Sequence, residues 1–200
     1  KESEKAARIH EVWQTLKDQG VPERVIDYVL PNEDSHFRLK KTTALYAAET
    51  WAENQRKTKL GWCLALAGGK GCGKSVAAGY WLYIKARKRT TLRQRTWWSA
   101  SRISRASSYD KNLDEMMQAP YMVIDDLGVE YMDKNGHFNG RLDELLEERC
   151  GNYLPTLITT NLNGIDFKER YGQRIVDRIR EDLKTGGAFI EIRDKSLRGI

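Results

Sequence analysis

Residues 64–75 read Leu-Ala-Leu-Ala-Gly-Gly-Lys-Gly-Cys-Gly-Lys-Ser, and this stretch decides the fold that we expect. Its last eight residues match the pattern G-x-x-x-x-G-K-[ST], which follows an apolar run at 60–67 and opens a helix-like segment. In that setting the glycines allow backbone N–H groups to point at phosphate oxygens, and the helix adds the positive end of its dipole. A glycine-rich turn that only joins a strand to a helix is the alternative. The Lys-Ser pair and the flanking segments favour a site for a nucleoside triphosphate.

We expect the ammonium group of Lys74 to reach the β- and γ-phosphates and the hydroxyl group of Ser75 to bind Mg²⁺, so ATP and Mg²⁺ are the expected cofactors. Cys72 stands beside Lys74 at the start of the helix. A thiol turned toward the loop would be reactive there, whereas a thiol turned inward would only fill space. The predicted nucleotide-binding residues are Gly68, Gly69, Lys70, Gly71, Cys72, Gly73, Lys74, Ser75 and Val76.

A second motif lies at residues 121–128, which read Tyr-Met-Val-Ile-Asp-Asp-Leu-Gly. Four apolar residues followed by two carboxylates are typical of a buried parallel strand, whose end we expect beside the phosphate-binding loop. Asp125 is predicted to hold Mg²⁺ through water, while Asp126 or Glu130 is predicted to orient the attacking water. A strand that simply runs into a turn is the alternative for so short a motif.

Two further segments carry polar side chains toward the expected site. Residues 156–161 read Thr-Leu-Ile-Thr-Thr-Asn, a strand whose terminal Asn161 is expected between the phosphate-binding loop and the carboxylates, in contact with the γ-phosphate or the water. The predicted helix 171–180 carries Arg174 and Arg178 on one face, because they are four residues apart. Arginines so placed either form surface salt bridges or reach the ATP of a neighbouring subunit.

Strands and helices alternate along the chain, which predicts an α/β fold with a parallel sheet. The length of 200 residues suits one such domain with a small appendage. We expect three layers with a five-stranded, mainly parallel sheet, a helical N-terminal arm at 1–35 and the main domain at 36–200. Strands are predicted at 60–67, 94–99, 121–124, 156–161 and, as an edge strand, 188–192; helices are predicted at 3–19, 23–30, 40–56, 76–89, 101–108, 141–149 and 171–180.

The composition argues against a membrane protein and against a disulfide or zinc scaffold. The chain has no run of eighteen apolar residues, so neither a membrane-spanning segment nor a membrane partner is expected. Its three cysteines lack C-x-x-C spacing, which predicts thiols in the cytoplasm.

The charges are unevenly distributed. The net charge is +6, but residues 54–109 hold thirteen Lys or Arg and no acidic residue. Such a block favours a polyanionic partner, since Lys and Arg release counterions from phosphates, and we expect single-stranded DNA. The alternative is a solvated face next to the nucleotide lysines. Adjacent strand residues point to opposite faces, so one ring of the Trp97-Trp98 pair could stack on a base, unless helices cover both. The expected DNA contacts are Arg93, Arg95, Trp97, Arg102 and Arg105.

Together these motifs resemble the AAA+ ATPases of the DnaC/IstB type, which are replicative helicase loaders and transposition helpers, over about residues 36–200. The segments that carry the resemblance are 68–75 (Walker A), 123–128 (Walker B), 158–161 (sensor 1), 173–178 (the arginine-finger box) and 196–198. The resemblance implies an AAA+ P-loop fold, with Asn161 as sensor 1 and Arg178 as the arginine finger beside Arg174. The chain ends too soon for a full C-terminal lid, so Arg198 is only a candidate for sensor 2.

The function that the resemblance implies is a weak ATPase stimulated by assembly or DNA. It would form a homo-oligomer with ATP at the subunit boundaries, hold single-stranded DNA and load a replicative helicase. A transposition helper shares the same core and stays open. A small P-loop kinase is a different class, which needs an acceptor pocket rather than a strand that ends in Thr-Thr-Asn. A nucleotide-gated adaptor with little hydrolysis is a third class, because Asp126 stands where a longer Glu is usual.

Overall fold

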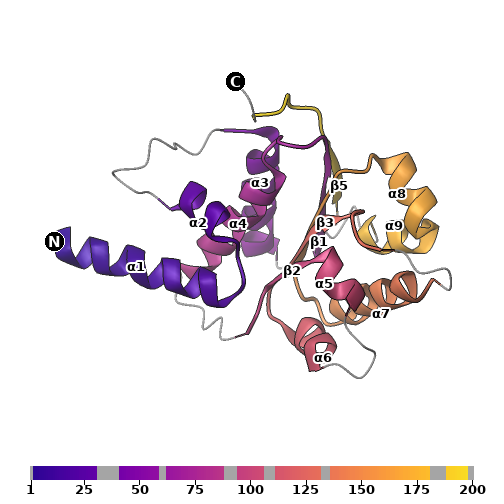
Figure 1. The fold of residues 1–200 in the computed structure, drawn as a ribbon, viewed down its shortest axis with the longest axis horizontal. Helices are drawn as coiled ribbons and strands as arrows, with labels where there is room; N and C mark the ends of the chain where they lie inside the picture. The colour runs from indigo at the N-terminus through magenta and orange to yellow at the C-terminus, as the bar shows by residue number, and fades with distance from the viewer. Residues whose placement is uncertain are drawn as a thin grey trace.

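The computed structural model describes residues 2–30, 41–58, 62–87, 94–105, 111–131, 136–180 and 188–197. Its sheet has the strand order β2-β3-β4-β1-β5, and all four neighbouring pairs are parallel. The predicted five-stranded parallel sheet is confirmed, with residues 188–192 at its edge (Figure 1). The strands are β1 (Cys63–Gly68), β2 (Trp97–Ser99), β3 (Met122–Leu127), β4 (Thr156–Thr160) and β5 (Ala188–Ile192).

The helices that precede and follow β1 cover one face of the sheet (Figure 1). Trp81 of α4 is fully buried there, in one hydrophobic cluster with Leu64 and Leu66 of β1. Leu16 and Ile26 of the first two helices belong to the same cluster, so the N-terminal arm packs into the core of the main domain. The helices on this face are α1 (Glu2–Asp18), α2 (Glu23–Val29), α3 (Thr43–Thr58) and α4 (Lys74–Ala86).

The remaining helices cover the opposite face, which completes the predicted three layers (Figure 1). A second hydrophobic cluster there includes Trp98 of β2, Leu145 of α7, Ile158 of β4 and Phe167 of α8. These helices are α5 (Ala100–Arg105), α6 (Lys111–Gln118), α7 (His137–Gly151), α8 (Gly164–Tyr171) and α9 (Gln173–Arg180). Among the described residues, no helix combines the length and the apolar character needed to cross a membrane.

Two helices were not predicted from the sequence, and one predicted helix is divided. Helix α6 buries Leu113 and Met116, and α8 buries Phe167 and Tyr171, so the apolar pattern of each rests on two positions. Helix α8 begins at a cap that the sequence does contain, since Asn163 Oδ1 accepts hydrogen bonds from the N–H groups of Ile165 and Asp166. Gly172 has φ 85° and separates α8 from α9, so the predicted helix 171–180 begins at Gln173.

Candidate active site

The glycine-rich loop for which phosphate binding is predicted follows β1 at the carboxyl edge of the sheet. Gly68 has φ 149°, and a Cβ atom added there would lie 2.4 Å from the carbonyl oxygen of Ile192 on β5. No side chain fits at that distance, so the close approach of β5 requires glycine at this position. Gly73 has φ 89° and is the residue immediately before α4, which therefore begins at Lys74 within the motif. The backbone thus has the curled form that the sequence pattern predicts.

Lys74 lies across the loop rather than pointing into solvent. Its Nζ donates hydrogen bonds to the carbonyl oxygens of Gly68 at 2.8 Å and Gly69 at 2.7 Å, and its exposed fraction is 6%. The same ammonium group donates to Asn161 Oδ1 at 3.1 Å. Because β4 lies between β1 and β3, Asn161 stands beside the loop, as its position at the end of β4 predicts.

Ser75 and Asp125 meet between α4 and β3. The Ser75 hydroxyl donates to Asp125 Oδ1 at 2.9 Å, and the Thr159 hydroxyl donates to the same oxygen at 2.7 Å. Burial raises the pKa of Asp125, while the hydrogen bond from Thr159 acts in the opposite direction. A hydroxyl and a carboxylate at this separation suit a shared divalent cation with oxygen ligands, so these residues fit the expected Mg²⁺.

Asp125 and Asp126 lie at a bulge near the end of β3. The register of β3 against β4 shifts between Ile124 and Leu127, and Asp126 has φ 57° with an exposed side chain. The Asp126 N–H donates to Thr159 Oγ1 at 3.0 Å, and the Thr160 hydroxyl donates to the carbonyl oxygen of Leu127 at 2.6 Å. The two threonine hydroxyls therefore replace ladder hydrogen bonds at the bulge. The strand pattern at 156–161 does not predict this role for either threonine.

The two candidates for orienting water differ sharply in their surroundings. Asp126 is exposed, whereas Glu130 has an exposed fraction of 3% and accepts hydrogen bonds from Arg170 and Tyr171. A buried carboxylate held by these donors has little freedom to contact a water beside a nucleotide. The geometry thus favours Asp126 for that role.

The two arginines of α9 form ion pairs with α7 of the same chain. Arg178 Nε contacts Asp143 Oδ1 at 2.8 Å, and Arg178 Nη2 contacts Glu147 Oε2 at 2.9 Å. Arg174 Nε contacts Asp143 Oδ2 at 2.8 Å. Exposed side-chain fractions are 68% for Arg174 and 15% for Arg178. The salt bridges that the sequence left as one alternative are therefore present in the single chain.

The proposed contact of Trp97 with DNA needs correction. Trp97 has an exposed fraction of 3% and Trp98 of 1%, because helices cover both faces of the sheet. Neither ring is open to a base. The guanidinium groups of Arg95 and Arg102 lie over the Trp98 ring, at 5.2 Å and 5.5 Å from its centroid. Arg102 and Arg105 are exposed on α5, and Arg93 lies outside the described residues.

Two further contacts define the surroundings of the loop. The Cys72 thiol is turned inward, with an exposed fraction of 1%, and it donates to the carbonyl oxygen of Gly69 at 3.1 Å. The inward alternative for this thiol is therefore the observed one. The Leu197 N–H donates to the carbonyl oxygen of Gly71 at 3.0 Å, which brings the C-terminal segment against the loop. Arg198 lies outside the described residues.

No protein-family model matches the chain, and no curated protein matches it by sequence. Solved structures do match it. The DnaC helicase loader has a TM-score of 0.59 and 21% identity, over 80% of this chain and 95% of that chain. DnaI has a TM-score of 0.61 and 22% identity, over 86% and 94%. AMPPCP-bound DnaA from Aquifex aeolicus has a TM-score of 0.57 and 15% identity, over 76% of this chain and 48% of that chain. The chain therefore shares the α/β fold of these solved structures, in agreement with the fold that the resemblance of its motifs predicts.

Proposed function

We propose that the chain binds and hydrolyses ATP with Mg²⁺, assembles on DNA and loads a replicative helicase. The observation that carries the proposal is the meeting of three separate motifs. Lys74 Nζ lies 3.1 Å from Asn161 Oδ1, and Ser75 Oγ lies 2.9 Å from Asp125 Oδ1. The fold shared with a DnaC helicase loader supports the partner, and the fold shared with an AMPPCP-bound protein supports the nucleotide.

Each residue of the meeting point has a chemical role that its surroundings support. Lys74 would exchange its two carbonyl partners for phosphate oxygens, and Asn161 would keep its contact beside them. Ser75 and Asp125 would hold Mg²⁺, Asp125 acting through water, and the cation supplies neutralisation of phosphate charge. Asp126, exposed next to them, would orient the attacking water.

The proposed assembly places ATP at the boundary between two chains. Arg178, with Arg174 beside it, would act on the nucleotide of the neighbouring subunit. Both arginines would then exchange Asp143 and Glu147 for phosphate oxygens. The side chain of Arg174 is 68% exposed, which supports contact with a neighbouring subunit. Arg102 and Arg105 are exposed on α5, which supports contact with single-stranded DNA. We also infer that the protein works in the cytoplasm, where replicative helicases act on DNA.

A nucleotide-gated adaptor is the second candidate, because one feature of the site favours slow turnover. Asp126 has a short side chain at a bulge with φ 57°, and the longer Glu130 is held in the interior. Such a site would bind ATP and release it largely unhydrolysed. A transposition helper would use the same residues but prefer duplex DNA.

The first experiment measures binding of Mg-ATP to the purified chain and to Lys74→Ala. We expect the variant to lose affinity by at least about 100-fold, since a buried charge-assisted contact to phosphate is removed. Lys168→Ala is the control, because it removes an exposed lysine that lies outside the motif, and it should bind nearly as tightly as the unchanged chain. Equal binding by the unchanged chain and Lys74→Ala would contradict the nucleotide site.

The second experiment separates the candidates for function. The mass of the assembly is measured with and without AMPPCP and single-stranded DNA, followed by a pull-down with a replicative helicase. A loader gains mass with both ligands and retains the helicase. Preference for duplex DNA without helicase binding would favour the transposition helper, and assembly without measurable phosphate release would favour the adaptor.

A further inference from the structure

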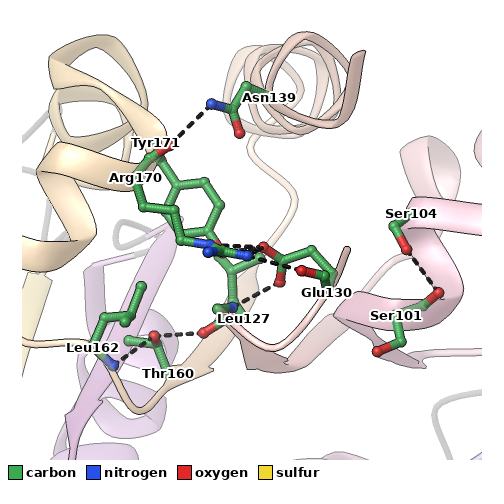
Figure 2. Close-up of polar contacts among 10 residues, drawn as sticks. Ser101, Ser104, Leu127, Glu130, Asn139, Thr160, Leu162, Arg170 and Tyr171 are labelled. Atoms are coloured by element: carbon green, nitrogen blue, oxygen red, sulfur yellow. Dashed lines mark hydrogen bonds and ion pairs between the residues drawn. The ribbon is translucent and has the colours of Figure 1, made fainter. Parts of the chain in front are cut away.

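Glu130 lies at the centre of a buried polar network next to the candidate active site (Figure 2). Its Oε1 accepts hydrogen bonds from Tyr171 Oη at 2.6 Å, Arg170 Nη2 at 3.0 Å and Arg170 Nε at 3.1 Å. Its Oε2 accepts from the N–H of Gly128 at 2.7 Å. Arg170 Nη2 also donates to the carbonyl oxygen of Glu130 at 2.8 Å. Arg170 thus holds both the side chain and the backbone of this residue.

This network ties the loop after β3 to the C-terminal end of α8. The loop begins after Leu127, which directly follows Asp125 and Asp126, the two carboxylates of the site. A carboxylate with no exposed side-chain area is tolerated only where donors satisfy it, so Glu130 strongly specifies one position of the loop. Burial and the neighbouring Glu130 raise the pKa of Tyr171, which therefore remains a hydrogen-bond donor at neutral pH.

The same network continues to the arginines of α9 through one face of α7. Asn139 Nδ2 donates to the carbonyl oxygen of Arg170 at 3.1 Å (Figure 2). Asn139, Asp143 and Glu147 follow one another at intervals of four, so they lie along one side of α7. Asp143 and Glu147 are the residues that hold Arg174 and Arg178. One side of α7 therefore contacts the end of α8 and also positions the side chains of α9.

We propose that Glu130 is a positioning residue that couples the nucleotide site of a chain to the arginines which that chain presents to its neighbour. This inference rests on the function proposed above. When nucleotide contacts displace Asp125 and Asp126, the loop pulls on Arg170, and α8 and α9 shift together on α7. The arginines then leave their ion pairs only in a chain that holds nucleotide, which would order hydrolysis around the assembly.

The test is hydrogen exchange of the amides of α9, measured with and without Mg-AMPPCP at a protein concentration where the mass is that of the monomer. In the unchanged chain, AMPPCP should alter exchange of these amides by at least about threefold, in either direction. Glu130→Gln should remove that nucleotide-dependent difference, while its dissociation constant for AMPPCP stays within about threefold. Glu148→Gln is the matched control, because Glu148 is an exposed carboxylate on α7, and it should retain the difference.

A purely structural role gives a different result. Glu130→Gln would then speed exchange of α9 equally in both states and keep the nucleotide-dependent difference, which overturns the proposal. If Glu130→Gln does not fold, Tyr171→Phe decides. This variant removes only the hydroxyl group and keeps the ring contacts with Phe138 and Phe167. If the proposed coupling exists, Tyr171→Phe reduces the nucleotide-dependent difference in exchange of α9. Binding of AMPPCP without any change at α9 in the unchanged chain overturns this proposal alone. Failure to bind AMPPCP overturns the proposed function as well.

Discussion

Most residues with a proposed function lie in two regions of the molecule, and the side chains of these regions make different contacts. The phosphate edge, defined here as Lys74, Ser75, Asp125 and Asn161, joins residues from three motifs by hydrogen bonds of 2.9–3.1 Å. The basic face, defined as Arg95, Arg102 and Arg105, lies on the segment of β2 and α5. Two of its arginines cover the buried ring of Trp98. The first region has a specific geometry, whereas the second has mainly charge.

This difference reflects the physics that each function needs. Phosphate binding requires backbone N–H groups, a cation and metal ligands in one arrangement, so its residues are confined to short motifs at strand ends. Binding of a nucleic-acid backbone requires only positive charge spread over a surface. We therefore expect single substitutions at the phosphate edge and at Arg178 to reduce nucleotide binding or hydrolysis strongly. Single substitutions on the basic face should reduce DNA binding only weakly.

The largest expected effect tests whether the phosphate edge is completed by a second chain. Arg178→Ala should lower ATP hydrolysis by about 10³-fold while ATP binding changes little, because an arginine finger acts on the transition state. Arg174→Ala is the comparison variant, since both arginines contact Asp143. Steady-state hydrolysis and nucleotide binding are measured for each variant alone and mixed with Lys74→Ala. Recovery in the mixture supports action in trans. A monomer under all conditions, with no recovery, would show that the phosphate edge works within one chain.

The second largest effect is expected at Trp97, which lies in the core rather than at a DNA-binding surface. Trp97→Ala should lower the free energy of unfolding by about 3–5 kcal/mol, because it leaves a cavity between the sheet and the first helices. Urea unfolding measures the loss, and Trp97→Phe should lose much less. DNA affinity of the folded variant, measured at several salt concentrations, should keep the original slope. If Trp97→Ala is as stable as the unchanged chain but binds DNA more weakly, Trp97 contacts DNA and is not part of the core.

A smaller effect is expected at the bulge of the phosphate edge. Thr159→Val removes the hydroxyl that donates to Asp125 and accepts from Asp126, and it leaves the partly buried N–H of Asp126 without this partner. The cost should be about 1–3 kcal/mol in unfolding free energy, with reduced hydrolysis. Thr159→Ser keeps the hydroxyl and should restore both properties. Thermal unfolding and hydrolysis assays check this, and equal behaviour of the Val and Ser variants would contradict it.

The smallest effect concerns the basic face itself. Arg102→Gln and Arg105→Gln should each reduce the salt dependence of DNA binding by about one unit of log–log slope, with a several-fold loss of affinity. Lys168→Gln on α8 is the control, because it removes an exposed cation from another helix. Binding is measured by fluorescence anisotropy over a range of salt. An unchanged slope in both arginine variants would exclude α5 from the DNA path.

Much of the phosphate edge could be predicted because each motif is short and ends a strand. Parallel strands bring their carboxyl ends to the same edge of the sheet, so the sequence pattern predicts that Lys74, Asp125 and Asn161 lie together. The partners of Glu130 could not be predicted in this way. Arg170 and Tyr171 lie on α8, in which the buried residues are Phe167 and Tyr171, and two apolar positions are too weak a pattern to be recognised as a helix.

The sequence by itself therefore predicted the α/β fold, the curled glycine-rich loop after β1 and the residues that meet beside it, because strand periodicity and glycine geometry are local properties of the chain. Only the tertiary structure decided that Glu130 is buried against Arg170, that Arg174 and Arg178 pair with α7, and that both rings of the Trp97-Trp98 pair lie in the core. These outcomes depend on which helix covers which face, and so on contacts between segments far apart in the chain.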